Sequence, residues 1–136
     1  MEENYHCYPK HLVAVDCIIF GFDGENLKIL LVQRNFEPQK GEWSLMGGFI
    51  ENEESSDQAA NRVLNTLTGL ENIYLEQLKT YTDIDREPTA RIMSISYYAL
   101  INIKDNIQIN EKYSAKWFDL KDRPDLIFDH NAMVKD

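Results

Sequence analysis

Short apolar runs follow one another along the chain, and most have the length and composition of β-strands. Residues 13–20 (VAVDCIIF) form a nearly continuous apolar run rich in β-branched side chains, which predicts a buried strand. Asp23-Gly24 then marks a turn into residues 27–33 (LKILLVQ), so the two runs predict a hairpin. After a polar stretch, residues 43–50 (WSLMGGFI) are again apolar, and further strands are expected near residues 74–81, 91–102 and 115–118.

One segment has the helical period. Residues 55–58 (SSDQ) have the form of a capping box, in which Ser55 bonds the backbone three residues on and Gln58 reaches back. Apolar side chains then recur at helical spacing, and Gly69 supplies the C-terminal stop. These apolar positions are Ala60, Val63, Leu64 and Leu67. A second, short helix is expected from about residue 129, after Pro124.

The run at residues 91–101 alternates in character. Its odd positions from Met93 to Ile101 are apolar or aromatic and share one face of the expected strand. Ser94, Ser96 and Tyr98 lie on the other face. A face of this kind suits either a wet pocket or a merely solvated surface, and the pattern does not choose between them.

Composition and charge narrow the class of protein. With 136 residues, 43% of them hydrophobic, the chain is long enough for one domain with a real core. It has neither an apolar run long enough to cross a bilayer nor a signal peptide, so a cytoplasmic location and no membrane partner are expected. Cys7 and Cys17 are expected to be reduced thiols.

The net charge of −9 argues against this domain gripping DNA by itself, because nonspecific binding of nucleic acid depends on Lys and Arg. The chain also stops inside the second expected helix. We therefore expect residues 1–136 to be a single domain of a longer protein, in which a further C-terminal domain would make any contact with DNA.

A spaced motif begins at the glycine pair Gly47-Gly48. From Gly48 the chain runs five residues to Glu54, seven to Arg62, one to Leu64, and on to Gly69-Leu70. This spacing resembles the Nudix box, and six of its nine fixed positions match. The other three, where that box carries glutamates, are occupied by Val63, Thr66 and Leu67.

The resemblance to Nudix domains extends over nearly the whole chain. It implies an α/β (α+β) fold, an α/β/α sandwich around a mixed sheet, in which the box forms a loop-helix-loop that presents glutamates to a divalent metal. The segments VQRNFEPQKGEWSLMGGF and FDH at residues 128–130 resemble the N-terminal sensor domains of Nudix-related transcription regulators. That group includes the NrtR type, responsive to ADP-ribose, and the AraR type, responsive to arabinose. Met46, where most Nudix domains have proline, is closer to the arabinose-responsive branch.

The substituted box positions argue against hydrolysis. Mg²⁺ needs hard oxygen ligands, and Val63 and Leu67 offer none, while Thr66 has only a neutral hydroxyl. A lone Glu54 does not assemble a catalytic cluster, and loss of the metal would cost on the order of 10³-fold or more in rate. We therefore expect no catalytic residues, no metal and no cofactor, with Val63 and Leu67 packed in the core.

One alternative keeps the chemistry. Glu51, Glu53, Glu54 and Asp57 are dense enough in acids to form a substitute Mg²⁺ site. They could equally be a solvated loop whose acids favour the N-terminus of a helix. Arg62 is expected to pair structurally with Glu54 or Glu51, and its replacement by Ala should lower the melting temperature more than ligand affinity.

The candidate ligand site gathers donors and aromatic rings from several segments. Arg34, Arg86 and Arg91 could donate to phosphate, carboxylate or sugar hydroxyls, although each could also be an ordinary surface arginine. Tyr98 and His130 are weaker candidates.

Aromatic side chains flank the glycine pair. A tandem of glycines such as Gly47-Gly48 is costly inside a strand unless the backbone bends or something approaches closely. Trp43 and Phe49, on either side, could stack on a base or a sugar, although core packing suits Trp43 better.

Two functions from different classes follow. In the first, the chain is a noncatalytic, dimeric effector-binding domain of a transcription regulator that senses an L-arabinose-like sugar or an ADP-ribose-like nucleotide. In the second, it is an active Nudix hydrolase that uses Mg²⁺ and a shifted set of carboxylates to cleave a substrate such as ADP-ribose.

Overall fold

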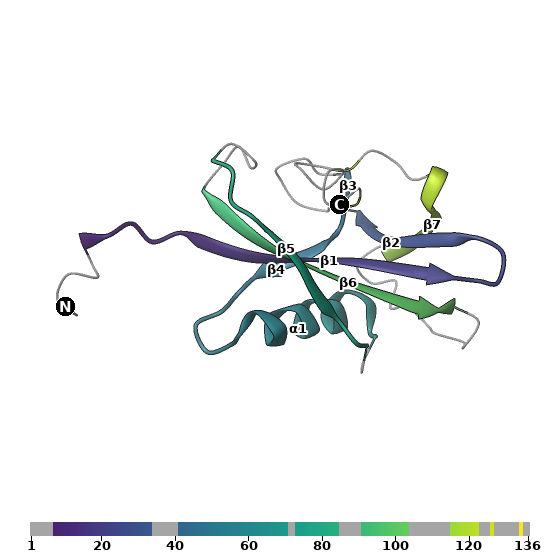
Figure 1. Ribbon diagram of the computed structural model, residues 1–136, viewed down its shortest axis with the longest axis horizontal. Coiled ribbons are helices and arrows are strands. Elements are labelled where there is room, and N and C mark those ends of the chain that lie inside the picture. The colour runs from purple at the N-terminus through teal and green to yellow at the C-terminus, as the bar shows by residue number, and fades with distance from the viewer. Residues whose placement is uncertain are drawn as a thin grey trace.

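A computed structural model describes residues 7–33, 41–70, 73–84, 91–103 and 115–122, together with Leu126 and Val134 (Figure 1). In chain order the elements are β1 (Leu12–Phe22), β2 (Leu27–Gln33), β3 (Trp43–Ser44), β4 (Met46–Phe49), α1 (Ser56–Thr68), β5 (Glu76–Tyr81), β6 (Ile92–Asn102), β7 (Ala115–Asp119) and a 3-10 turn, η4 (Leu120–Asp122). Every expected strand is confirmed within a few residues, and the apolar run at residues 43–50 divides into β3 and β4 at Leu45.

The strands form a seven-stranded mixed sheet in the order β3-β2-β1-β6-β5, with β4 paired to β1 and β7 paired to β2. The hairpin between β1 and β2 is confirmed. The long strands β1 and β6 are parallel over their whole length, whereas the other pairs are antiparallel. Since β6 occupies one edge of β1, β4 and β2 share the other edge, β4 along residues 14–17 and β2 along residues 19–22.

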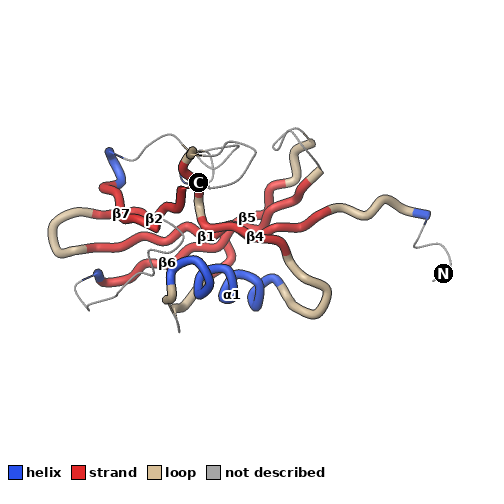
Figure 2. The backbone as a smooth tube through the Cα atoms, turned by 180° about the vertical axis from the view of Figure 1, so that it is seen from behind, coloured by secondary structure: helices blue, strands red, loops and turns tan. Residues whose placement is uncertain are grey.

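Helix α1 covers one face of the sheet (Figure 2). It begins as expected, because the Ser55 hydroxyl accepts from the Gln58 amide and the Gln58 side chain accepts from the Ser55 amide. It ends at Gly69, whose φ of 81° is the left-handed conformation that glycine adopts at low cost. Among the described residues, no helix is long and apolar enough to span a membrane.

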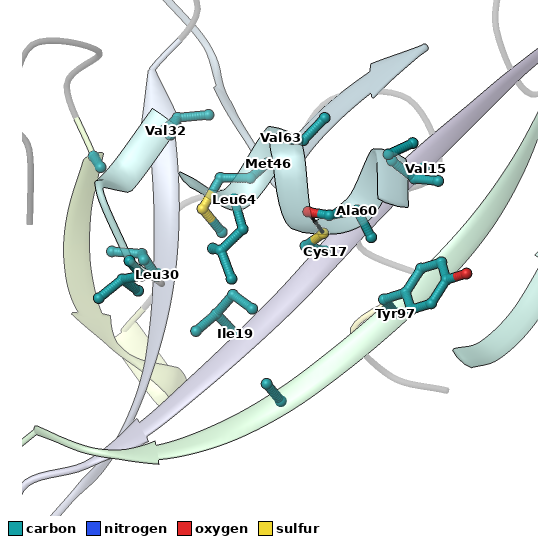
Figure 3. Close-up of a cluster of buried hydrophobic side chains, with 14 residues drawn as sticks. Val15, Cys17, Ile19, Leu30, Val32, Met46, Ala60, Val63, Leu64 and Tyr97 are labelled. Carbon is teal, nitrogen blue, oxygen red and sulfur yellow. Dashed lines mark hydrogen bonds between the residues drawn. The ribbon is translucent and has the colours of Figure 1, made fainter. Parts of the chain in front are cut away.

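Two hydrophobic clusters lie on opposite faces of the sheet. The first, under α1, contains Val15, Cys17, Met46, Val63, Leu64 and Tyr97 among others (Figure 3). The second is built around Ile18, Ile29, Leu31, Leu45 and Leu126, with Trp43, Tyr98 and Val134 packed against it. The mixed α and β class is therefore confirmed. The expected final helix falls almost entirely outside the described residues, so the second helical layer stays a prediction.

The alternation along β6 is confirmed, but Ser94 and Ser96 line neither a wet pocket nor a solvated surface, so both expectations for them are wrong. Tyr97 and Ala99 are buried in the first cluster, as their parity predicts. On the opposite face Ser94 and Ser96 are fully buried, so these serines do not form a solvated surface. Their hydroxyls donate to Asp16 and to the Lys79 carbonyl, which satisfies each group inside the protein.

Both cysteines are free, as expected. Cys7 is exposed, whereas Cys17 is buried and its thiol lies 3.8 Å from the carbonyl oxygen of Ala60. Burial, reinforced by the neighbouring Asp16, raises the pKa of Cys17 to about 12, so this thiol stays protonated and packs as a small apolar group.

Candidate functional site

The box occupies the end of β4, the following loop and α1. Gly48 lies in β4, and Glu54 lies in the loop before the helix. Leu64 and Leu70 are buried in the cluster under the helix. The positions that match the family motif therefore hold the loop-helix-loop together.

Arg62 joins the parts of this frame. Its Nε and Nη2 atoms donate to Glu54 at 3.0 and 2.7 Å, a forked pair, and Nη2 also donates to the carbonyl oxygen of Phe49 at 2.7 Å. We expected Arg62 to pair with Glu54 or Glu51, and the pairing with Glu54 is confirmed. One guanidinium thus fastens the helix to the loop and to the end of β4.

The carboxylate of Glu54 is fully engaged by the protein. Besides the fork from Arg62, its Oε1 atom accepts from the amide of Glu51 at 2.9 Å. These donors, with the Arg62 bond as the largest cause, hold the pKa of Glu54 below its usual range. The same pair raises the pKa of Arg62. Glu54 therefore acts as a structural anion that is already neutralised by its partners.

The substituted positions show why the frame survives without its glutamates. Val63 is buried in the cluster under α1, and Leu67 is half-buried and packs against the same cluster, as expected. Thr66 lies on the exposed side of the helix. Two aliphatic side chains and one hydroxyl do not match the hard, charged oxygens that Mg²⁺ takes from proteins.

The nearby acids do not converge. Glu51 and Glu53 are exposed, while the Oδ1 atom of Asp57 accepts from the Tyr97 hydroxyl at 2.5 Å. Among the side chains that the structure describes, no group of three or more His, Cys, Asp or Glu could hold a metal ion.

The glycine pair is explained by two side chains of the protein itself. A Cβ atom on Gly47 would lie 2.4 Å from Oδ1 of Asp16, and one on Gly48 would lie 2.7 Å from Cγ2 of Val63. The expectation of a close approach is therefore confirmed. The approaching groups come from β1 on one side and from α1 on the other.

Two of the expected ligand-binding side chains, Phe49 and Arg91, lie toward one end of the sheet. Phe49 is half exposed and pairs with Ala14, near the end of the sheet where Arg91 precedes β6. Arg91 donates to the carbonyl of Thr82 at 3.3 Å. Arg34, Arg86 and His130 lie outside the described residues.

Trp43 and Tyr98 lie on the face away from α1. Trp43 makes an edge-on contact with Phe118, with ring centroids 4.8 Å apart, inside the second cluster. The hydroxyl of Tyr98 donates to Glu76 at 2.7 Å, and this bond raises the pKa of Tyr98. Trp43 thus packs in the core, and a stacking role for it stays a prediction.

Two residues important to the site carried little signal in the sequence. Asp16 is the one charged residue in the apolar run at residues 13–20, which could have marked it. Tyr97 lies in the first cluster, yet its hydroxyl contacts Asp57 and, at 2.7 Å, Ser56 in the first turn of α1. Burial and the bond to Asp57 raise the pKa of Tyr97.

Two known proteins are similar to this chain in sequence. The chain is 37% identical over 133 residues to an ADPR responsive transcriptional repressor of Acinetobacter baylyi, covering 94% of this chain and 53% of the repressor. It is 34% identical over 134 residues to an ADP-ribose pyrophosphatase of Methanocaldococcus jannaschii, covering 98% of this chain and 77% of that enzyme. The chain thus spans about half the length of the repressor.

Solved structures give the same family. The NUDIX domain of Shewanella oneidensis NrtR, in complex with ADP ribose, superposes with a TM-score of 0.83 and 33% identity over 96% of this chain and 88% of that one. A crystal structure of Shewanella oneidensis NrtR gives the same TM-score at 35% identity, over 92% of this chain and 60% of that one. The family profile described as NUDIX domain matches residues 10–135, and the chain therefore belongs to the Nudix family.

Proposed function

We propose that this Nudix domain binds ADP-ribose as an effector without hydrolysing it, as the sensor domain of a transcription regulator. The observation that carries the proposal is the state of the box. Its frame is intact, Val63 and Leu67 are packed against the core, and Glu54 is committed to Arg62.

The chemistry of the site supports binding without cleavage. Stabilising the charge that develops during diphosphate hydrolysis requires a metal or an equivalent set of positive groups. None of the three substituted box positions, Val63, Thr66 and Leu67, supplies a carboxylate to hold that metal. Among the described residues, the acids near Glu54 do not form a group that could hold it instead. We therefore propose that the domain works without a metal cofactor.

The relatives support the choice of ligand. The repressor similar to this chain is described as ADPR responsive, and a solved domain of similar structure contains ADP ribose. A sugar of the L-arabinose type remains the alternative effector that Met46 suggests, and it forms the second arm of the test.

The wider role is part of the same proposal. Because Shewanella oneidensis NrtR has been solved with a 27mer DNA and this chain covers 58% of that protein, we propose that any contact with DNA belongs to a domain beyond this one. The net charge of −9 supports that division. We further propose a homodimer in the cytoplasm.

Calorimetry and thermal melting test the effector directly. ADP-ribose at about 100 times its dissociation constant should stabilise the domain by about 2.7 kcal/mol, since it binds only the folded state. L-arabinose, measured beside it, should give no shift. A shift from the sugar alone would replace the nucleotide by the sugar, and no shift from either would refute the sensor.

A hydrolase is the second candidate, favoured by the identity to the Methanocaldococcus jannaschii pyrophosphatase and by the retained Glu54–Arg62 pair. Incubation of the protein with ADP-ribose and Mg²⁺ or Mn²⁺ separates the two functions. We expect the ADP-ribose to remain intact. Turnover that Glu54→Gln abolishes would establish the enzyme instead.

A further inference from the structure

A carboxylate lies buried in the middle of the sheet. Asp16 is 5% exposed, although it sits in an otherwise apolar stretch of β1. It pairs with Gly47 of β4 on one edge and with Ser96 of β6 on the other. The hydroxyl of Ser94 donates to its Oδ2 atom at 2.5 Å. The side chain of this β1 residue is therefore bonded to β6, while its backbone lies between β4 and β6.

The carboxylate also determines how closely β4 approaches β1. The absent Cβ of Gly47 would fall 2.4 Å from Oδ1 of Asp16 and 3.2 Å from the carbonyl oxygen of Val15. Oδ1 thus occupies the volume that a side chain at position 47 would need. From the opposite face Val63 does the same at Gly48. Strand β4 is held between a carboxylate and a helix side chain.

The backbone of β4 leads directly into the box loop. The carbonyl of Phe49 accepts from Arg62, and the amide of Ile50 donates to the carbonyl of Val13 at 2.9 Å. The amide of Glu51 then donates to Glu54. A small displacement of β4 would therefore move every backbone group from which the loop starts.

Stability alone does not account for a carboxyl group at this place. Burying a carboxylate has a desolvation cost that an apolar residue of similar volume would avoid, and replacing a buried polar pair by apolar groups is often neutral or stabilising. A polar group does, however, fix one geometry more strictly than apolar packing does.

We infer that Asp16 is a positioning residue for effector binding: its carboxylate, oriented by Ser94, fixes the backbone of β4 and with it the start of the box loop. This inference rests on the proposed function, because Phe49, the last residue of β4, is the expected contact for ADP-ribose that would move with this strand. Asp16 acts through the backbone of β4 rather than by touching the ligand.

Two buried serines of β6 supply a matched test. Ser94 and Ser96 are both fully buried on the same face, but Ser94 donates to Asp16 whereas Ser96 donates to the Lys79 carbonyl of β5. Ser94→Ala and Ser96→Ala therefore each remove one buried hydroxyl. The first loses a bond to β1 on one edge of β6, and the second loses a bond to β5 on the other edge. Comparing them separates a role in positioning β4 from a general loss of stability.

Two readouts are needed, one of which does not depend on the ligand. The first is hydrogen exchange of the Ile50 amide, measured by NMR against the Gly69 amide at the end of α1, which donates to Asn65. The second is the dissociation constant for ADP-ribose by calorimetry. We expect Ser94→Ala to accelerate exchange at Ile50 and to weaken binding by about fivefold each, as the loss of roughly 1 kcal/mol implies. Ser96→Ala should change neither by more than about twofold.

Variants of Asp16 complete the test. Asp16→Asn keeps the volume and an oxygen that accepts from Ser94, so it should stay close to the wild type in both readouts. Asp16→Ala should behave like Ser94→Ala, and in its background Gly47→Ala should be tolerated better than in the wild type.

The outcomes are distinguishable. Equal effects of the two serine substitutions, or unchanged exchange at Ile50 in Ser94→Ala, would overturn the positioning role. If the wild type binds no ADP-ribose, the proposed effector fails, while the exchange difference still decides whether Asp16 positions β4.

Discussion

Arg62 occupies a position on α1 from which its guanidinium reaches the preceding loop and the end of β4. Its side chain is 37% exposed, whereas that of Glu54 is 13% exposed, so the pair is screened more weakly than a fully exposed ion pair. The forked geometry fixes orientation as well as charge, because two parallel N–H groups meet one carboxylate. In this chain the pair holds α1 to the preceding loop.

Arg62→Ala should therefore affect stability before it affects binding. Removing the guanidinium takes away the bonds to Glu54 and to the Phe49 carbonyl, and we expect the melting temperature to fall by about 3 °C. The affinity for ADP-ribose should fall by a smaller free energy than the stability does, through the looser start of the box loop. Arg62→Lys keeps the charge without the forked geometry, so its melting temperature should lie between those of the wild type and Arg62→Ala. A loss of affinity at unchanged melting temperature would place Arg62 in the ligand site instead.

The carboxylate of Glu54 gives a pH signature. Its pKa in the folded protein lies below its ordinary value of 4.5, chiefly because of the bond from Arg62. A lowered folded pKa contributes stability that is fully present above the unfolded pKa and is lost as the pH falls through the folded value. The melting-temperature advantage of the wild type over Glu54→Gln should therefore be constant near neutral pH and shrink below about pH 4.5. An advantage that persists unchanged into that acidic range would contradict the assignment.

At the scale of elements, the contact between α1 and β4 depends on the absence of a side chain. Val63 projects from the helix onto the backbone of Gly48, where a Cβ atom would be 2.7 Å away (Figure 3 labels Val63 among the buried side chains under α1). Helix and strand are closer here than any larger residue would allow. Gly48, a glycine of the family motif, thus packs against Val63, which stands where the motif has a glutamate.

Gly48→Ala should consequently destabilise the domain by about 1–3 kcal/mol in urea unfolding, because the added methyl group overpacks the contact. Val63→Ala in the same chain should relieve part of that loss, so the double variant should be less destabilised than the sum of the single variants. Gly41→Ala is the control. Its φ of +92° makes a side chain strained, but nothing lies within 4 Å of the added Cβ, so Val63→Ala should not rescue it. Additive losses at positions 48 and 63 would refute the contact.

At the scale of the whole molecule, a single tyrosine ties the helix layer to the sheet. Tyr97 projects from β6 through the first cluster, and its hydroxyl meets Asp57 and Ser56 in the first turn of α1. The apolar ring fills the space between the layers while the hydroxyl reaches the polar end of the helix. The orientation of α1 on the sheet thus has a polar anchor as well as apolar packing.

Tyr97→Phe should lower the free energy of unfolding by about 1 kcal/mol, since it removes the hydroxyl and leaves the ring in place. Tyr98→Phe, the neighbour on the opposite face, loses an exposed bond to Glu76 and should cost less than about 0.5 kcal/mol. Urea unfolding of the two variants measures the difference. Equal costs would mean that the hydroxyl of Tyr97 does not anchor the helix.

Local patterns were enough to predict the elements and the frame of the box. We expected the strands, the capping box at Ser55, the stop at Gly69 and the Arg62–Glu54 pair. Each of these features depends on residues that are close together in the sequence. The alternation of β6 was also readable, since the side chains of a strand change face at every residue.

The sequence pattern did not predict which segments of the protein cover each face of β6. The pattern left Ser94 and Ser96 open between a wet pocket and a solvated surface, because a lone strand carries no information on what covers it. The structure buries both serines and joins Ser94 to Asp16, a partner 78 positions away in the sequence.

The sequence by itself thus determined the secondary structure, the family frame and the loss of the box glutamates, since these follow from residue type and short spacing. Only the tertiary structure decided that Asp16 and Val63 fill the space beside Gly47 and Gly48, and that Tyr97 anchors α1. These contacts depend on the antiparallel pairing of β4 with β1, on the parallel pairing of β6 with β1, and on the packing of α1 against the sheet. Such long-range arrangements leave no period in the sequence, because they arise only when distant segments are brought together in the folded chain.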